Sequence, residues 1–166
     1  GGGPNWTALY AVDRIQAQFT PQQNSALNAD LQSARAILDK VLARLTASAI
    51  FPTASVQDMR QKVRNVFHIN VMDPMAPDFL TEMFAFTNLV ANFKTLRTVG
   101  FDQQFPFHFE ADYTKDLVAW VVGTSDPLVH IAPAYFYQDA GQGIYTPIHE
   151  RAHTVLQLQG HPPDGT

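Results

Sequence analysis

Apolar side chains recur at intervals of three and four residues through the first hundred positions, which is typical of amphipathic helices. We predict helices over residues 6–19, 21–47, 55–67 and 78–99. The longest apolar stripe lies in the second of these, and consists of Leu27, Leu31, Ala34, Leu38, Val41, Leu42 and Leu45. Residues 73–77 contain two prolines and are expected to form a loop. The first part of the chain is therefore predicted to be a layer of helices.

The pattern changes after Gly100, where three segments are typical of strands. Residues 105–110 alternate with period two, residues 117–122 are continuously apolar, and residues 128–137 are expected to form a third strand. Pro133 lacks an N–H group, so this third strand should lie at an edge of the sheet or end there. The predicted fold class is α+β, with an N-terminal helical layer, a small antiparallel sheet and a C-terminal helix.

That C-terminal helix would carry the sequence His149-Glu150-Arg151-Ala152-His153, a His-Glu-x-x-His motif. Positions four apart share one face of a helix, so both imidazoles can bind one zinc ion. Glu150 can then accept a proton from a metal-bound water and pass it to a leaving amine.

The residues around the motif favour a short, half-buried helix. Thr146 is a plausible N-cap, Pro147 suits the first helical position, and Gly160 is expected to end the helix. The glycines of residues 141–143 are expected to form a flexible loop before it. A buried stripe at helical spacing is predicted for Ile148, Ala152, Val155 and Leu156.

A catalytic zinc usually has three protein ligands and one open position. His161 is the first choice for the third ligand and Asp164 the second, because both follow the predicted end of the helix. Residues in or near the predicted strands are alternative third ligands, although most such residues are ordinary strand side chains that bind no metal. These alternatives are His108, Glu110, Asp112 and His130. Tyr135, Tyr137 and Tyr145 are candidates for stabilising an oxyanion.

Composition narrows the classes of function. The length of 166 residues suits a single domain over residues 6–166, and residues 1–5 read as a linker. The net charge of −4 and the absence of a Lys/Arg cluster argue against a nucleic-acid partner. No apolar run approaches the ~20 residues needed to span a bilayer, so no membrane partner is expected. Without cysteine, a thiolate metal site is impossible. The natural sequence is expected to continue beyond both ends.

The order of these parts resembles the deuterolysin-type zinc metallopeptidases, the aspzincins, which include lysine-specific endopeptidases. The resemblance loosely covers residues 20–164, and only the zinc motif is specific. The strand ending Ile131-Ala132-Pro133-Ala134-Tyr135-Phe136 is similar to one common in that family. The resemblance implies a zincin-like fold, a zinc ion held by two histidines and an aspartate, a tyrosine at the transition state, and a secreted or extracytoplasmic protein. Asp164 lies at a family-like distance, but Gly165-Thr166 follows it rather than precedes it.

The sequence therefore predicts a zinc-dependent metallo-endopeptidase that acts on a peptide or protein substrate. His149 and His153 would bind the metal with His161 or Asp164, and Glu150 would be the catalytic base. An edge strand, with 128–137 as the first candidate, would pair with the substrate. Two alternatives stay open. One is a zinc-binding or toxin-associated module without turnover, and the other is a metal-free helical binding domain.

Overall fold

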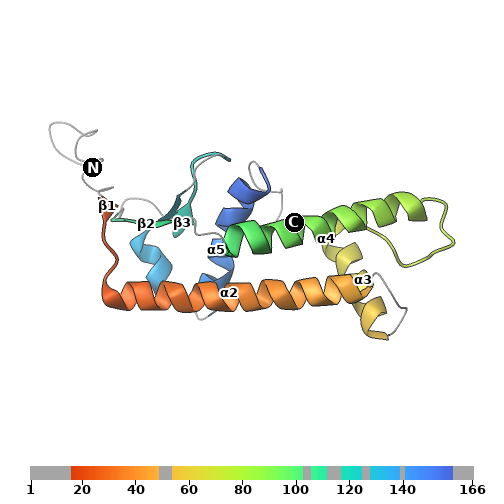
Figure 1. The fold of residues 1–166 in the computed structure, drawn as a ribbon, viewed down its shortest axis with the longest axis horizontal. Coiled ribbons are helices and arrows are strands. Elements are labelled where there is room, and N and C mark those ends of the chain that lie inside the picture. Colours follow the sequence, from red (N-terminus) through yellow and green to blue (C-terminus); the bar gives the residue numbers. More distant parts are fainter. Residues whose placement is uncertain are drawn as a thin grey trace.

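The fold comes from a computed structural model that describes residues 16–48, 54–102, 106–111, 117–124, 128–138 and 141–158. Helix α2 (Pro21–Ser48) runs along the length of the molecule, and α4 (Phe79–Phe101) lies beside it (Figure 1). Helix α3 (Ala54–Phe67) packs at one end, whereas a small sheet and α5 (Gln142–Val155) lie toward the other. The mixed helix and strand content confirms the α+β class.

Helices α2, α3 and α4 lie where the apolar spacing predicts them, within two residues at each end. The start of α2 is a capping box, because Thr20 Oγ1 accepts the Gln23 N–H at 3.1 Å and Gln23 Oε1 accepts the Thr20 N–H at 2.9 Å. Pro21 occupies the first helical position, where a missing N–H has no cost. The predicted loop over residues 73–77 is also present.

The predicted helix over residues 6–19 is wrong in the part that the structure describes. Gln16–Ala17 form strand β1, which pairs with β2 in antiparallel register; residues 6–15 lie outside the described residues. Phe19 packs on Phe109 with ring centroids 5.3 Å apart. Phe19, the last residue of the predicted helix, therefore packs against the sheet's core, and tertiary packing overrides the local pattern.

Four strands form one sheet in the order β1-β2-β4-β3, with β2 at Phe107–Glu110, β3 at Ala119–Trp120 and β4 at Val129–Ile131. The prediction of an antiparallel sheet is wrong, because β2 and β4 are parallel while the other two pairs are antiparallel. The segment predicted as the third strand is central rather than at an edge. It ends at Ile131, as Pro133 favours, and Pro133–Tyr137 form the 3₁₀ helix η1.

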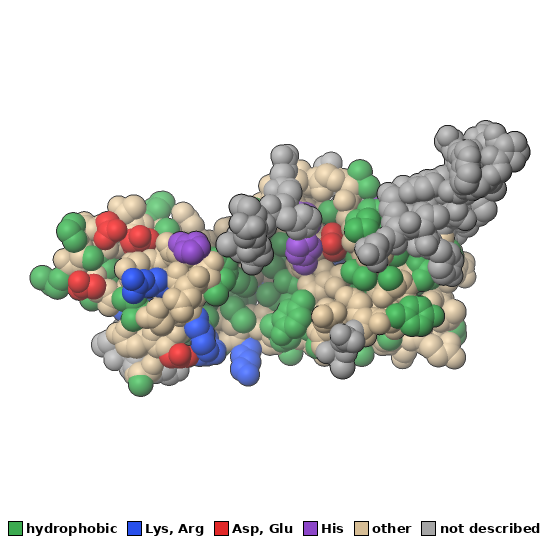
Figure 2. Space-filling view, turned by 180° about the vertical axis from the view of Figure 1, so that it is seen from behind, with side chains coloured by type: hydrophobic (Ala, Val, Ile, Leu, Met, Phe, Trp, Pro, Cys, Tyr) green, Lys and Arg blue, Asp and Glu red, His purple; other side chains and the backbone are tan. Residues whose placement is uncertain are grey.

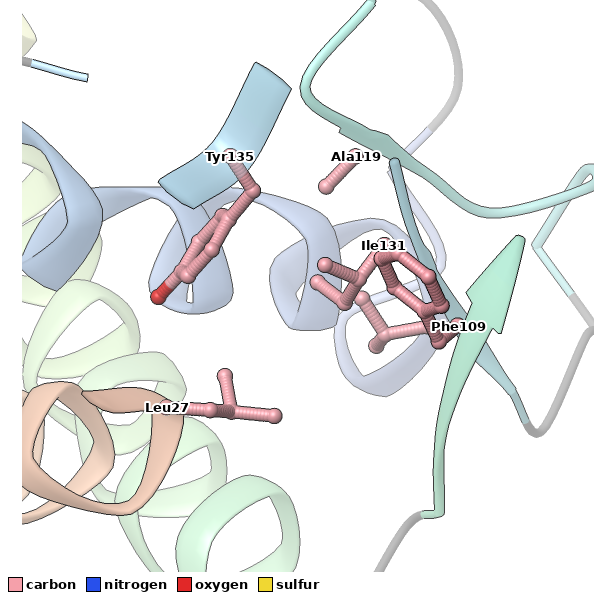
Figure 3. Close-up of a cluster of buried hydrophobic side chains, with 6 residues drawn as sticks. Leu27, Phe109, Ala119, Ile131 and Tyr135 are labelled. Atoms are coloured by element: carbon pink, nitrogen blue, oxygen red, sulfur yellow. The ribbon is translucent and has the colours of Figure 1, made fainter. Parts of the chain in front are cut away.

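One face of the sheet packs in the hydrophobic core, and the opposite face carries polar and aromatic side chains. Alternation along the strands sends Phe109, Ala119, Val129 and Ile131 toward α2, where they pack with Leu27 and Tyr135 (Figure 3). The opposite face carries His108, Glu110, Trp120 and His130, which lie against one another.

Helix α5 closes the core between the sheet and the long helices. Ile148, Ala152, Val155 and Leu156 pack against a cluster formed by α2 and α4, as predicted, but they are only partly buried, and Leu156 lies just after the helix. Seen from behind, Lys, Arg, Asp and Glu side chains gather over the end formed by α3 and α4, and hydrophobic side chains are more frequent over the middle (Figure 2). Among the described helices, none has the length and apolar content that a membrane span requires.

Candidate metal centre

The motif helix begins earlier and ends earlier than predicted. Its N-cap is Gly141, at φ 93°, so Thr146 is not the cap and Pro147 is not at the first helical position. Two of the three residues of the predicted loop 141–143 are helical. The last helical residue is Val155, and Gln157 turns the chain at φ 56°, before the predicted stop at Gly160.

Pro147 lies inside α5, where its missing N–H leaves the carbonyl of Gly143 without the usual helical donor. The Tyr135 hydroxyl lies 2.8 Å from Gly143 O and 2.8 Å from Asp30 Oδ2 of α2, so these two acceptors share its single proton and the phenol takes the place of the missing donor. Burial, followed by Asp30, raises the pKa of Tyr135 far above its usual range. A Cβ at position 143 would approach Asp30 Oδ2 to 2.5 Å, so a larger residue there would displace the Asp30 carboxylate from its place beside Tyr135. The start of α5 is thereby fixed to both η1 and α2.

One turn further along, the two motif histidines face each other. The Nε2 atoms of His149 and His153 are 3.3 Å apart. Two nitrogens bound to one tetrahedral zinc at its usual bond length lie about 3.3 Å apart, so the pair has the spacing of a shared metal. His153 Nδ1 lies 2.9 Å from the carbonyl of Leu158. Because a carbonyl only accepts, Nδ1 carries a proton, which leaves Nε2, the nitrogen that faces His149, as the one able to bind a metal.

Glu150 sits beside this pair but deeper in the protein. Its Oε1 is 4.0 Å from His149 Nε2, and its side chain is 12% exposed against 50% for His149. Burial raises the pKa of Glu150 to about 7, opposed by the charge of His153 and by a hydrogen bond from the Val121 N–H. A carboxyl group whose pKa is near 7 is suited to both accepting and returning a proton.

The histidines and Glu150 open into a cleft of about 680 Å³ between α5 and residues 117–124. Most of the other side chains in its lining are apolar: Leu117, Val118, Ala119, Trp120, Val121, Tyr145 and Leu158. Leu117, Tyr145 and Leu158 are 43%, 59% and 51% exposed, which is unusual for large apolar residues. The cleft therefore offers apolar contact surface next to the paired imidazoles.

The described residues bring together two of the three predicted metal ligands. His161, Asp164 and Asp112 lie outside them. His108, Glu110 and His130 form their own cluster on the sheet, and within the described ranges no three His, Asp or Glu side chains form a metal-binding group. The third ligand therefore stays a prediction.

The three tyrosine candidates are now distinguishable. Tyr145 lines the cleft, whereas Tyr135 is buried and occupied by Gly143 and Asp30, so it is not available to an oxyanion. Tyr137 is 86% exposed and is not among the residues that line the cleft. The sequence analysis missed two backbone groups, the Val121 N–H on Glu150 and the Leu158 carbonyl on His153. Backbone groups leave no signal in residue type.

Comparison with known proteins identified no relative of this chain. No family model, no curated protein and no solved structure matches this chain.

Proposed function

We propose that this protein is a zinc-dependent endopeptidase with a zincin-like fold, as its resemblance to the deuterolysin-type enzymes implies. The observation that carries the proposal is the 3.3 Å separation of His149 Nε2 and His153 Nε2, with the Glu150 carboxyl beside them. A direct hydrogen bond between the two rings has a similar spacing, so the pair supports the proposal through its combination with the Glu150 carboxyl and the open cleft.

His149 and His153 would hold the ion through Nε2, and His161 or Asp164 is proposed as the third ligand. The carbonyl of Leu158 supports this role, because it fixes the ring orientation and tautomer of His153. Zinc held there would supply Lewis acidity, which favours attack of water on a peptide carbonyl.

The role assigned to Glu150 is proton transfer. Its carboxylate would accept the proton of the attacking water and later deliver it to the departing amine nitrogen. Burial beside His149 suits this role, because the side chain is positioned at the wall of the cleft and shielded from bulk solvent. Tyr145, the exposed tyrosine of the lining, is the candidate for contacting the oxyanion.

An extended peptide is the substrate that the cleft suits best. Strand β3 is at the edge of the sheet, so β3 replaces residues 128–137 as the strand proposed to pair with the substrate. The Val118 carbonyl accepts the Ala132 N–H at 3.0 Å, so the backbone groups of Ala119 and Val121 point the other way. Val121 in turn contacts Glu150, so a peptide added along this edge would run past the proposed base. Apolar side chains of the substrate would contact Leu117 and Leu158.

The test is zinc content together with peptide cleavage by the purified protein. We expect about one zinc per chain, cleavage of a peptide library, loss of cleavage after removal of the metal by a chelator, and recovery on adding zinc. Anomalous X-ray scattering at the zinc edge would identify the third ligand. Protein that cleaves equally well with and without chelator would contradict the proposal.

A second candidate is a zinc-binding module without turnover. The observation that favours it is that the described residues provide two metal ligands and no third. A protein that holds zinc at one per chain but cleaves no peptide in the library would support this alternative over the peptidase.

A further inference from the structure

The cleft beside the paired imidazoles has two ends, and two contacts set its direction along α5. The Val121 N–H donates to Glu150, in the middle of the helix. Three residues later, the Thr124 carbonyl accepts the Gln157 side chain at 2.9 Å, just beyond the end of the helix. Residues 117–124 therefore run beside α5 in the same direction as the helix, and the first of them lie toward its start.

The end of the cleft toward the start of α5 is lined by two large apolar side chains that solvent reaches. Tyr145 lies one turn before His149 on the same face of α5, and Leu117 begins the segment that runs beside the helix. Both side chains line the cleft and are about half exposed. Apolar surface left in water next to a candidate catalytic group gains free energy when a ligand covers it.

The other end of the cleft is lined by smaller residues. Leu158 is fixed beside His153, because its N–H donates to the His153 carbonyl at 3.1 Å and its own carbonyl lies 2.9 Å from His153 Nδ1. The segment beside α5 contributes only Gly123 and Thr124 here. The two ends therefore differ, and the end at Leu117 and Tyr145 offers the larger apolar surface.

The charge of the lining favours the same kind of ligand. Among the described residues that line the cleft, Glu150 is the one carboxylate and none is lysine or arginine. Glu150 is only 12% exposed and is already assigned to proton transfer. A lysine side chain in this cleft would lose hydration without gaining a dedicated counter-charge from these residues. A leucine or phenylalanine side chain would instead be stabilised by leaving water.

We infer that the end of the cleft at Leu117 and Tyr145 is a specificity pocket for one large apolar side chain, aromatic or branched aliphatic, next to the bond that is cleaved. The inference rests on the proposed peptidase function, and it gives this protein a preference opposite to that of the lysine-specific enzymes that it resembles. The Tyr145 ring would form a wall of the pocket, and its hydroxyl stays the candidate for the oxyanion. Because the two ends of the cleft differ, the apolar residue should lie on one side of the cleaved bond only.

The experiment is digestion of a peptide library by the full chain with zinc, with the cleaved bonds identified by mass spectrometry. On one side of the bond, we expect large apolar residues to exceed lysine by about 10-fold or more, within the discrimination that a hydrophobic pocket provides. Leu117→Glu, at an exposed position, places a carboxylate in the wall and should lower this ratio by about 10-fold. Leu80→Glu is the matched control, because it makes the same change at an exposed position of α4, and should leave the ratio unchanged.

Two substitutions at position 145 separate the ring from the hydroxyl. Tyr145→Phe keeps the ring and should keep the ratio, whereas Tyr145→Ser removes the wall and should lower it. Equal cleavage beside apolar residues and lysine would overturn the inference, and so would an equal fall in Leu80→Glu. An unchanged ratio in both Leu117→Glu and Tyr145→Ser, or an equal fall in Tyr145→Phe and Tyr145→Ser, would also overturn it.

A binding measurement distinguishes failure of this inference from failure of the proposed function. The probes are two pools of short labelled peptides, randomised except for a central phenylalanine or lysine, and their binding to Glu150→Gln protein with zinc is followed by fluorescence polarisation. Tighter binding of the phenylalanine pool by about 10-fold, abolished by adding Leu117→Glu, supports the pocket, and if the wild-type protein then cleaves nothing, only the peptidase is contradicted. Equal binding of the two pools overturns the pocket, and cleavage without preference leaves the peptidase intact.

Discussion

Two pairs of neighbouring histidines in this protein use their ring nitrogens in different ways. On α5, His149 and His153 lie with ring centroids 5.0 Å apart, and their Nε2 atoms face each other at the cleft. On the outer face of the sheet, His108 and His130 occupy partner positions of β2 and β4, with centroids 5.6 Å apart. The spacing of the rings is similar, so proximity alone does not distinguish the two pairs.

The difference lies in their partners and exposure. His130 Nδ1 is 2.5 Å from Glu110 Oε1, its ring stacks on Trp120, and the side chains of this acid–imidazole pair are only 13% and 12% exposed. His149 is half exposed, and the Nδ1 of His153 is held by a backbone carbonyl, which directs Nε2 into the cleft. Burial and the aromatic stack favour a structural role for the sheet pair, whereas exposure at the open face of the cleft favours a cation at the α5 pair.

The largest expected effect concerns zinc. Replacing His153 by alanine removes a proposed ligand, and zinc bound at one per chain should be lost on dialysis. His130→Ala is the matched change in the sheet pair and should leave the zinc content at the wild-type level, as measured by atomic emission. Loss of zinc in the His130 variant instead would reverse the assignment of the two pairs.

The next largest expected effect is on the rate of peptide hydrolysis, compared between variants of Glu150 and Glu110. Glu150→Gln should keep zinc but lower kcat/KM by on the order of 10²–10⁴, the usual contribution of a general base. Glu110→Gln should leave the rate unchanged, because Glu110 contacts His130 on the sheet's outer face. Cleavage of casein at the wild-type rate by the Glu150 variant would exclude it as the base.

A smaller effect should follow from loosening the turn after α5. The Gln157 side chain donates to Thr124 O at 2.9 Å and to Thr154 O at 2.7 Å, and so holds the turn that places the Leu158 carbonyl on His153. Gln157→Ala should lower zinc affinity by about 10-fold, as for other groups that orient a metal ligand. Competition with a fluorescent chelator measures this, and Gln61→Ala on α3 is the neutral control.

The smallest expected effect is on the stability of the metal-free protein. Here a substitution in the sheet pair should matter more than a substitution in the α5 pair. Glu110→Gln removes a charged partner from a largely buried imidazole and should lower the free energy of unfolding by about 1–3 kcal/mol. His149→Ala, at a half-exposed position, should change it by less than about 0.5 kcal/mol. Urea unfolding followed by circular dichroism compares them, and equal losses would contradict the structural role of the sheet pair.

The sequence predicted local features well and non-local ones poorly. Apolar spacing located α2, α3 and α4, and the two histidines of the motif were expected on one helix face, where they lie. The parallel pairing of β2 with β4 depends on a register between segments about twenty residues apart, which no local pattern specifies. Pro147 was placed at a helix start because that position costs no hydrogen bond. The donor that makes its internal position tolerable, the Tyr135 hydroxyl, comes from another element.

That internal proline has a consequence for attempts to transplant the motif. A synthetic peptide covering Gln142–Val155 would contain both histidines and Glu150, yet it would lack the phenol that replaces the missing amide donor. It would also lack the carbonyl that orients His153, which belongs to Leu158. Grafting these fourteen residues onto a foreign scaffold would thus transfer the motif without the groups that hold its histidines in place. A successful graft has to include η1 and the turn after α5 as well.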